Sequence, residues 1–320
     1  MADSVTNGSV TNGWHGKISL DFGYHHNSSV STPDKRSSEL FRSGSTRLMT
    51  SQSIAPLKVQ RPFYPEGDRV CHSVIVHTAG GMVGGDRLNQ NISVSSAAHA
   101  LVTTAAASKA YKSNGQSVHQ AIHMTVATNG CLEWLPQPLI MFNGAQYDQH
   151  LRVDLAPEAI WIGWDITRLG RTLRGERFDA GRWRSRLEIW QEDIPLWIDL
   201  QWIQGGSDML TSTHGLNRCP VVGTFAMLGK EVSDTIVHQA RVAYSQPQLT
   251  QETSQGRRSK KELLSGSTGG VSQLQSGLVC RYRGHSTIEA QRWFMHVWQL
   301  VRQEYLARSI CPPRVWQWRL

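Results

Sequence analysis

The sequence predicts an all-β body that is followed by one C-terminal α-helix, and three observations carry this prediction. Residues 70–76, 121–126 and 196–202 show the period of two that is typical of half-buried strands. Asn114-Gly115 and Asn129-Gly130 lie between such segments, and Asn-Gly is a strong signal of a two-residue β-hairpin turn. A helical pattern follows near the end of the chain.

The helix is predicted to begin after Ser286 and to extend to Ser309. Residues 286–289 read STIE and form a capping box, in which the serine and glutamate side chains satisfy backbone N–H groups of the first turn. Pro312 marks the end of the segment. The apolar residues that repeat near the helical period are Ile288, Phe294, Val297, Val301 and Tyr305.

The length of 320 residues allows a substantial core, and we predict a single domain over 13–320 after a disordered tail at 1–12. Residues 245–277 are rich in Gln, Ser and Gly, which predicts a disordered insertion within that domain. No apolar run is long enough for a membrane span, and the polar N-terminus does not resemble a signal peptide. Five scattered cysteines without a C-x-x-C pair favour a reducing, cytoplasmic setting.

The net charge of +8 raises the possibility of a nucleic-acid partner. The cations are scattered, however, and no helix-turn-helix, zinc-finger or RNA-binding aromatic motif accompanies them. An acidic protein partner explains the charge equally well, because complementary charge speeds the encounter of two proteins. We therefore expect a protein partner and no nucleic acid.

A glycine loop at 80–86 contains Gly80, Gly81, Gly84 and Gly85 and closes with Asp86. A Walker loop would need Lys and then Ser or Thr after its last glycine, and the G-x-G-x-x-G spacing of dinucleotide sites is absent. The loop is therefore not predicted to bind a nucleotide. We interpret the four glycines as a structural turn, which is the commonest reason for clustered glycine.

Five blocks in this order carry a family resemblance: 56–67 (PLKVQRPFYPEG), the glycine loop with Asp86, 103–113 (TTAAASKAYKS), 132–142 (LEWLPQPLIMF) and 169–181 (LGRTLRGERFDAG). They resemble the signature blocks of the urease accessory protein UreD family, also called UreH. The closing PRVW at 313–316 is also similar to the C-terminal motif of that family. The similarity covers most of 13–318.

The resemblance implies an open β-helix-like scaffold without chemistry of its own. It implies a metallochaperone that helps to insert nickel into apo-urease, in complex with UreF and the GTPase UreG, in the cytoplasm. The alternative is a β-fold hydrolase or metal-dependent enzyme with a carboxylate site, which requires two close carboxylates in one cleft. No pair of acids that are close in the sequence suggests such a cleft.

The histidines and cysteines do not have the spacing of a tight, closed metal site. Cys71 and His72 are adjacent in a predicted strand and would face opposite sides of it. We therefore expect no tightly bound cofactor and only transient Ni²⁺, which would pass along carboxylates and waters. The candidate passage acids are Glu66, Asp86, Glu133 and Glu176, and for each of them the simpler interpretation is an ordinary salt bridge or a buried hydrogen bond.

The apolar stripe of the C-terminal helix must be buried, either against the β body of this chain or against a UreF-like partner. Because scaffolds of the resembled family act in complexes, we favour a partner interface. Its predicted residues are Val297, Val301, Arg314 and Trp316.

Overall fold

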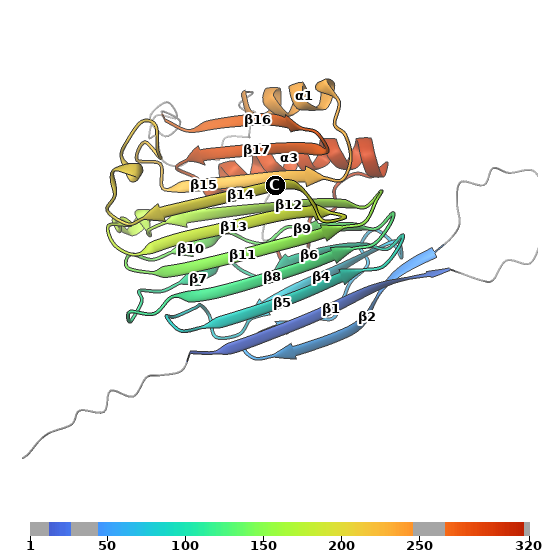
Figure 1. Ribbon diagram of the computed structural model, residues 1–320, viewed down its shortest axis with the longest axis horizontal. Helices are drawn as coiled ribbons and strands as arrows, with labels where there is room; N and C mark the ends of the chain where they lie inside the picture. Colours follow the sequence, from blue (N-terminus) through green and yellow to red (C-terminus); the bar gives the residue numbers. More distant parts are fainter. Residues whose placement is uncertain (1–12, 27–43, 246–265, 317–320) are drawn as a thin grey trace, which may run out of the picture.

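The structure is a computed structural model that describes residues 13–26, 44–245 and 266–316. Two β-sheets lie face to face, and two α-helices cover the outer face of one of them (Figure 1). The seven-stranded sheet has the order β14 (Ile194–Gln204), β13 (Arg182–Gln191), β11 (Gln146–Leu155), β8 (Val118–Val126), β5 (Arg87–Val94), β1 (His15–His26) and β2 (Gly44–Ile54).

The ten-stranded sheet has a main path of eight strands with two short strands beside it. Its main order is β16 (Thr268–Leu274), β17 (Gly277–Gly284), β15 (Val221–Leu228), β12 (Ile160–Leu169), β9 (Cys131–Trp134), β6 (His99–Thr104), β4 (Val70–His77) and β3 (Leu57–Val59). The two short strands are β10 (Leu139–Met141), which pairs with β12, and β7 (Ser108–Ala110), which pairs with β10. Two 3₁₀-helices, η1 (Thr172–Arg174) and η2 (Asp208–Leu210), lie in loops.

Apart from the short strands β7 and β10, the strands from β4 to β13 alternate between the two sheets, and each new strand lies parallel to the one before it in its own sheet. This winding confirms the predicted all-β, open β-helix-like scaffold. The two Asn-Gly hairpins were predicted wrongly, because Asn114-Gly115 and Asn129-Gly130 connect strands of different sheets. Gly115 and Asn129 adopt positive φ (111° and 59°) at these corners without pairing the flanking strands.

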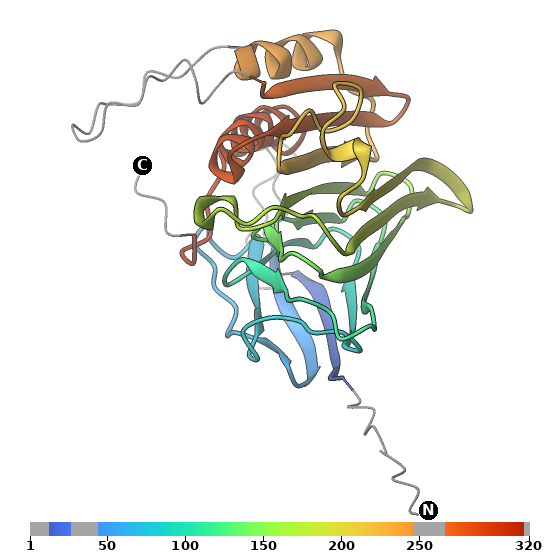
Figure 2. The ribbon, with the colours of Figure 1, turned by 90° about the vertical axis from the view of Figure 1, so that its left-hand side faces the viewer.

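The C-terminal helix α3 (Thr287–Leu306) is confirmed, and the Ser286 side chain accepts a hydrogen bond from the Glu289 N–H at 3.2 Å. It packs on the ten-stranded sheet, on the side away from the β13–β14 hairpin (Figure 2). Val297 and Val301 are fully buried in the core between α3 and that sheet. The prediction that these two side chains bind a partner is therefore wrong, because the chain's own sheet covers them.

The rest of the predicted partner interface divides into a buried and an exposed part. Trp316 is buried, and its indole N–H donates to Thr103 Oγ1 at 2.9 Å, so it also belongs to the chain's own core. Arg314 is exposed and keeps its predicted partner role as an open prediction. No helix among the described residues combines the length and the apolarity that crossing a bilayer requires.

The predicted insertion at 245–277 is corrected at both ends. Ser245 is the last residue of a helix, α1 (Asp234–Ser245), which the sequence analysis did not predict. Residues 268–274 form β16, which pairs antiparallel with β17 and buries Val271. The Gly- and Ser-rich composition concealed an edge strand that needs few apolar side chains. The remainder, 246–265, and the predicted tail at 1–12 lie outside the described residues.

The glycine loop forms a corner of the coil. Gly80 and Gly85 have φ of 74° and 97°, a region that favours glycine, which supports the predicted structural turn. Between them, Met82 is buried and begins a ladder across successive windings that continues through Ala110, Met141 and Leu169. The loop therefore lies at one end of this row of stacked apolar side chains.

The Asp86 side chain stabilises this turn through hydrogen bonds to backbone N–H groups. Its buried carboxylate accepts hydrogen bonds from the backbone N–H groups of Val83 at 2.9 Å and Trp14 at 2.8 Å. The second bond ties the start of the chain to the loop. Asp86 therefore acts as a capping group for two backbone donors.

We expect Asp86→Ala to lower the free energy of unfolding by about 1–3 kcal/mol, because partly buried N–H groups would lose their acceptor. Asp86→Asn keeps one acceptor oxygen and should cost less. Urea unfolding followed by circular dichroism measures both values. An alanine variant as stable as the wild-type chain would show that the corner does not depend on this carboxylate.

Candidate functional site

The ten-stranded sheet is buried on both faces, so that the strand β12 contributes to two separate cores. Trp161 faces the space between the sheets, whereas Ile162, Trp164 and Ile166 face α3. This division follows from the period of two along a strand. Each core contains a cluster of polar side chains, and both clusters are candidates for function.

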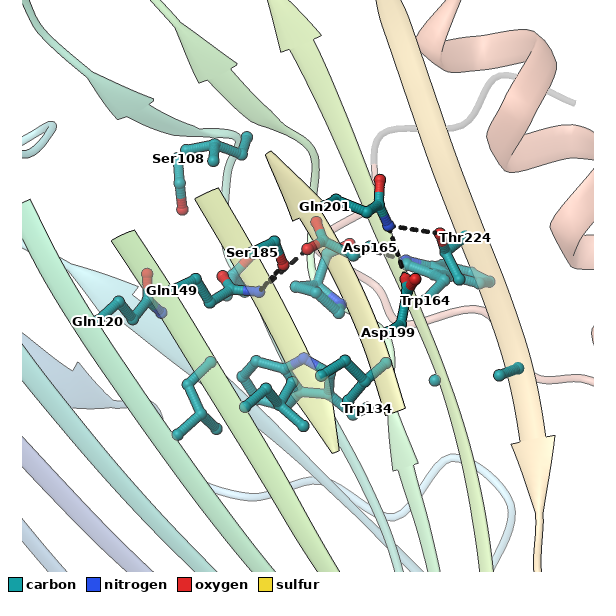
Figure 3. Close-up of a pocket in the computed structure, with 18 of the residues that line it drawn as sticks. Ser108, Gln120, Trp134, Gln149, Trp164, Asp165, Ser185, Asp199, Gln201 and Thr224 are labelled. Atoms are coloured by element: carbon teal, nitrogen blue, oxygen red, sulfur yellow. Dashed lines mark hydrogen bonds between the residues drawn. The ribbon is translucent and has the colours of Figure 1, made fainter. Parts of the chain in front are cut away.

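The first cluster lines a pocket of about 60 Å³ between the two sheets (Figure 3). Side chains of both sheets point toward one another across it. The polar residues that line it are Gln120, Tyr147, Gln149, Ser185, Asp199 and Gln201 from the seven-stranded sheet, and Thr104, Ser108, Asp165 and Thr224 from the ten-stranded sheet.

These side chains form a hydrogen-bonded chain across the pocket. The Tyr147 hydroxyl lies 2.6 Å from Gln120 Oε1 and 2.9 Å from Gln149 Oε1. Gln149 Nε2 in turn donates to Asp165 Oδ2 at 3.0 Å (Figure 3). Burial raises the pKa of Tyr147 well above its usual range, so its hydroxyl stays protonated at neutral pH.

Asp165 is the chemically distinctive member of the pocket. Burial raises the pKa of its carboxyl group to about 6, and the nearby charge of Asp199 acts in the same direction, against the hydrogen bond from Gln149. At neutral pH the group carries a charge that its surroundings do not neutralise. Such a carboxylate gains from the approach of a cation.

The negative charge of Asp199, in contrast, is neutralised by a neighbouring arginine. Arg281 donates to Asp199 Oδ2 at 2.7 Å, and Gln201 Nε2 donates to the same oxygen at 2.8 Å. Arg281 also donates to Thr224 Oγ1 at 2.9 Å, which fixes the guanidinium beside Asp199. The pocket is therefore lined by one neutralised and one uncompensated carboxylate.

A second cavity of about 130 Å³ lies beside the glycine loop and shares Thr104, Ser108 and Gln120 with the first. Both ring nitrogens of His77 and the amide oxygen of Gln90 are buried here without a hydrogen-bond partner in the described part of the chain. Burial lowers the pKa of His77, against the charge of Asp86, so the imidazole is neutral at pH 7. The two cavities are neighbours, and the polar atoms that line them, some without a partner among the described residues, are called the polar route below.

The second polar cluster lies in the core under α3 and is centred on Arg302. This side chain is fully buried and donates to Glu66 at 2.8 Å and 2.9 Å and to Glu133 at 2.8 Å. His72 Nε2 lies 2.7 Å from Glu66, and His99 contacts Glu133. One arginine of the C-terminal helix therefore pairs with two carboxylates that come from distant parts of the chain.

The pKa shifts of the cluster follow from this arrangement. Burial alone would raise the pKa of Glu133, but Arg302 and His99 outweigh it and lower the pKa to about 2. Burial also raises the pKa of Glu66, but the interactions with His72 and Arg302 outweigh burial, so that the pKa is lowered overall. Because the folded-state pKa of both acids is depressed, their contribution to stability is present above the ordinary glutamate pKa and is lost as the pH falls below about 4.

Among the described residues, one group of three side chains has the geometry to hold a metal ion. The candidate ligand atoms of His99, Cys131 and Glu133 lie within 4.8 Å of one another. Arg302 and the Trp298 indole already use both oxygens of the Glu133 carboxylate. Burial raises the pKa of the Cys131 thiol well above its usual range. A buried guanidinium and a protonated thiol both oppose a bound cation, so these residues do not fit a closed metal site.

None of the four predicted passage acids lines the pocket between the sheets. Glu66 and Glu133 bind Arg302, and Asp86 caps the glycine loop. Glu176 is half-buried and forms a salt bridge with Arg171, which lowers the pKa of that carboxyl group. The structure thus gives each acid a protein partner, and its metal role stays a prediction.

Asp165 and Asp199 are not among the site residues predicted from the sequence. The available signal was the segment 160–169 (IWIGWDITRL), where a single acid interrupts a strand that is otherwise apolar. A strand buried on both faces shows such a continuous apolar run, and an acid within it must face an interior.

Comparison with known proteins supports the resemblance in the sequence blocks. A family profile described as UreD urease accessory protein matches residues 37–317. A Nostoc punctiforme protein named urease accessory protein UreD is 49% identical over 313 residues, which cover 98% of this chain and 99% of the relative. Proteins of the same name from a Nostoc species and a Janthinobacterium species are 47% identical over 308 residues (96% and 98%) and 37% identical over 273 residues (85% and 87%).

We expect Arg302→Met to lower the free energy of unfolding by about 3–5 kcal/mol, because it leaves two carboxylates buried without a counter-charge. Lys230→Met is the matched control, since its ion pair with Glu158 lies at the surface and contributes at most about 1 kcal/mol. Guanidinium unfolding compares the two variants. Equal losses of stability would show that the buried ion pairs of Arg302 contribute no more to the stability of the fold than a surface ion pair does.

Asp165→Asn should stabilise the fold at pH 7.5, since it removes a charge that burial disfavours. The raised folded-state pKa means that the wild-type chain loses stability as the pH rises from about 4 through about 6. The difference in melting temperature between the variant and the wild type should therefore shrink as the pH falls from 7.5 to about 4. A difference independent of pH would contradict the raised pKa.

Proposed function

The chain belongs to the UreD urease accessory protein family and has a role in urease maturation, and we propose that it delivers nickel as a scaffold. In this proposal it acts in the cytoplasm with UreF and the GTPase UreG on apo-urease, and it catalyses no reaction of its own. The observation that carries the proposal is the polar route between the two sheets. It connects the glycine-loop end of the coil with Asp165 and Asp199.

The donor atoms along this route suit an ion in transit. The cavity near the loop offers the neutral imidazole of His77, and the pocket beyond it offers amide, hydroxyl and carboxylate oxygens. Nickel prefers imidazole over these oxygen donors, so the oxygens bind it weakly. A series of weak sites lets a divalent ion move, whereas a tight site would retain it.

We propose that Asp165 is the carboxylate that meets the ion inside the route. Its charge is uncompensated above pH 6, in contrast to Asp86, Glu66, Glu133 and Glu176, which all have protein partners. A cation beside Asp165 lowers the cost of keeping this group ionised. The electrostatic attraction is strong because the surroundings are largely apolar.

The alternative of a hydrolase with a carboxylate pair is less well supported. Asp165 and Asp199 do line one pocket, but Arg281 neutralises Asp199. The pocket volume of about 60 Å³ has room for an ion and a few waters. It is far below the roughly 300–1,000 Å³ of pockets that hold organic substrates.

The test is complementation of a deletion strain with the wild-type chain, Asp165→Asn or His77→Gln. Deletion should leave the urease subunits expressed and assembled but nearly without nickel and activity. Each variant should lower the nickel content of purified urease several-fold, as measured by mass spectrometry, while the variant itself stays folded. Asp179→Asn is the matched control, because this acid is exposed and lines neither cavity.

Two results would contradict the proposal. Normal urease nickel in the deletion strain would exclude a delivery role for the chain. Normal nickel with both variants would leave the accessory role intact but would exclude the route between the sheets.

A further inference from the structure

Residues 198–202 of strand β14 have an inverted pattern, in which apolar side chains face solvent and polar side chains face the interior. Ile198, Leu200 and Trp202 are 40%, 62% and 63% exposed. Asp199 and Gln201, which alternate with them, line the pocket between the sheets. β14 is also an edge strand of its sheet. Adjacent exposed apolar side chains on an edge strand are typical of a surface that another protein covers.

The neighbouring strands place cations beside this apolar edge. Arg184 on β13 is the cross-strand partner of Trp202, and Arg186 is the partner of Leu200. The row of Trp202 continues across the sheet through Arg184, Asp148, His119 and Arg87. All of these residues line one surface groove of about 960 Å³, which is large enough for a segment of another protein.

The charges of this groove are only partly compensated. Arg182 pairs with Asp148 at 2.9 Å, and Arg186 contacts Glu188. Arg87 and Arg184 form no ion pair with any residue that the structure describes. Asp148 Oδ1 is a buried acceptor without a hydrogen-bond partner among the same residues. The exposed guanidinium groups of Arg87 and Arg184 are therefore open to carboxylates of a partner, whereas Asp148 is already paired.

We infer that this groove, formed by Arg87, His119, Asp148, Arg184, Leu200 and Trp202, docks an acidic surface of the urease apoprotein. Carboxylates of the partner pair with Arg87 and Arg184, and its apolar side chains cover Leu200 and Trp202. The identity of the partner rests on the proposed function, whereas its chemistry rests on the groove.

A protein fits this chemistry better than a nucleic acid does. A phosphate backbone would satisfy the arginines, and a base could stack on Trp202. It would also place phosphates beside the carboxylates of Asp148 and Glu188, which already pair with Arg182 and Arg186. A protein surface can supply anions and apolar contacts together.

The test is the binding of immobilised full-length chain to purified apo-urease, measured by interferometry at about 50 mM and 300 mM salt. The double variant Arg87→Glu/Arg184→Glu should bind at least about tenfold more weakly, and Trp202→Ala should lose a similar factor. Lys58→Glu/Arg61→Glu is the matched control, because it reverses two exposed cations outside the groove. Circular dichroism confirms that each variant is folded.

The affinity of the wild-type chain should also fall at the higher salt concentration, and that of the charge-reversed variant should change less. Unchanged binding by both groove variants would overturn the docking surface while leaving nickel delivery, tested by complementation, intact. An equal loss in the Lys58/Arg61 control would overturn it as well, because only total charge would then matter. Tighter binding to a mixed-sequence oligonucleotide than to apo-urease would overturn it in favour of nucleic acid.

Discussion

The burial of Arg302 between Glu66 and Glu133 is the contact on which the arrangement of the domain depends. The three residues come from α3, from the loop before β4 and from β9, and they are 236 and 169 positions apart in the sequence. Removal of a charged group from water is costly unless its partners are already in place. The position of α3 in which both carboxylates meet the guanidinium is therefore favoured over positions that would leave these charges buried without partners.

Because α3 covers the outer face of the ten-stranded sheet, this sheet has a hydrophobic core on each of its two faces. Because Ile162, Trp164 and Ile166 pack under α3, the hydrophobic core that holds the C-terminal half together lies outside the coil. The space between the sheets has its own hydrophobic core, and Asp165, Gln149 and the other polar groups are confined to the small pocket within it.

The sequence was sufficient for the local features and insufficient for the question of which surfaces meet. The period of two predicted strands, and the capping box placed the start of α3 at Ser286. The same apolar stripe did not reveal that this chain covers Val297, since burial by a partner leaves an identical pattern. The Asn-Gly signals showed that the chain turns, but a turn between two sheets and a hairpin require the same backbone freedom. The partners of Glu133 could not be predicted, because no local pattern around residue 133 indicates that Arg302 lies beside it in the fold.

Strand β14 connects the proposed route with the proposed docking groove. Its side chains alternate, so that Asp199 and Gln201 face the pocket while Leu200 and Trp202 face the groove. Asp199 is held by Arg281, which comes from β17 of the opposite sheet. A partner that covers the outer face of β14 thus lies one strand thickness from the polar interior. Because β14 pairs with a single neighbour, it has fewer hydrogen bonds to break than a central strand has. A partner that binds at this edge of the seven-stranded sheet can therefore influence the carboxylates of the route most directly.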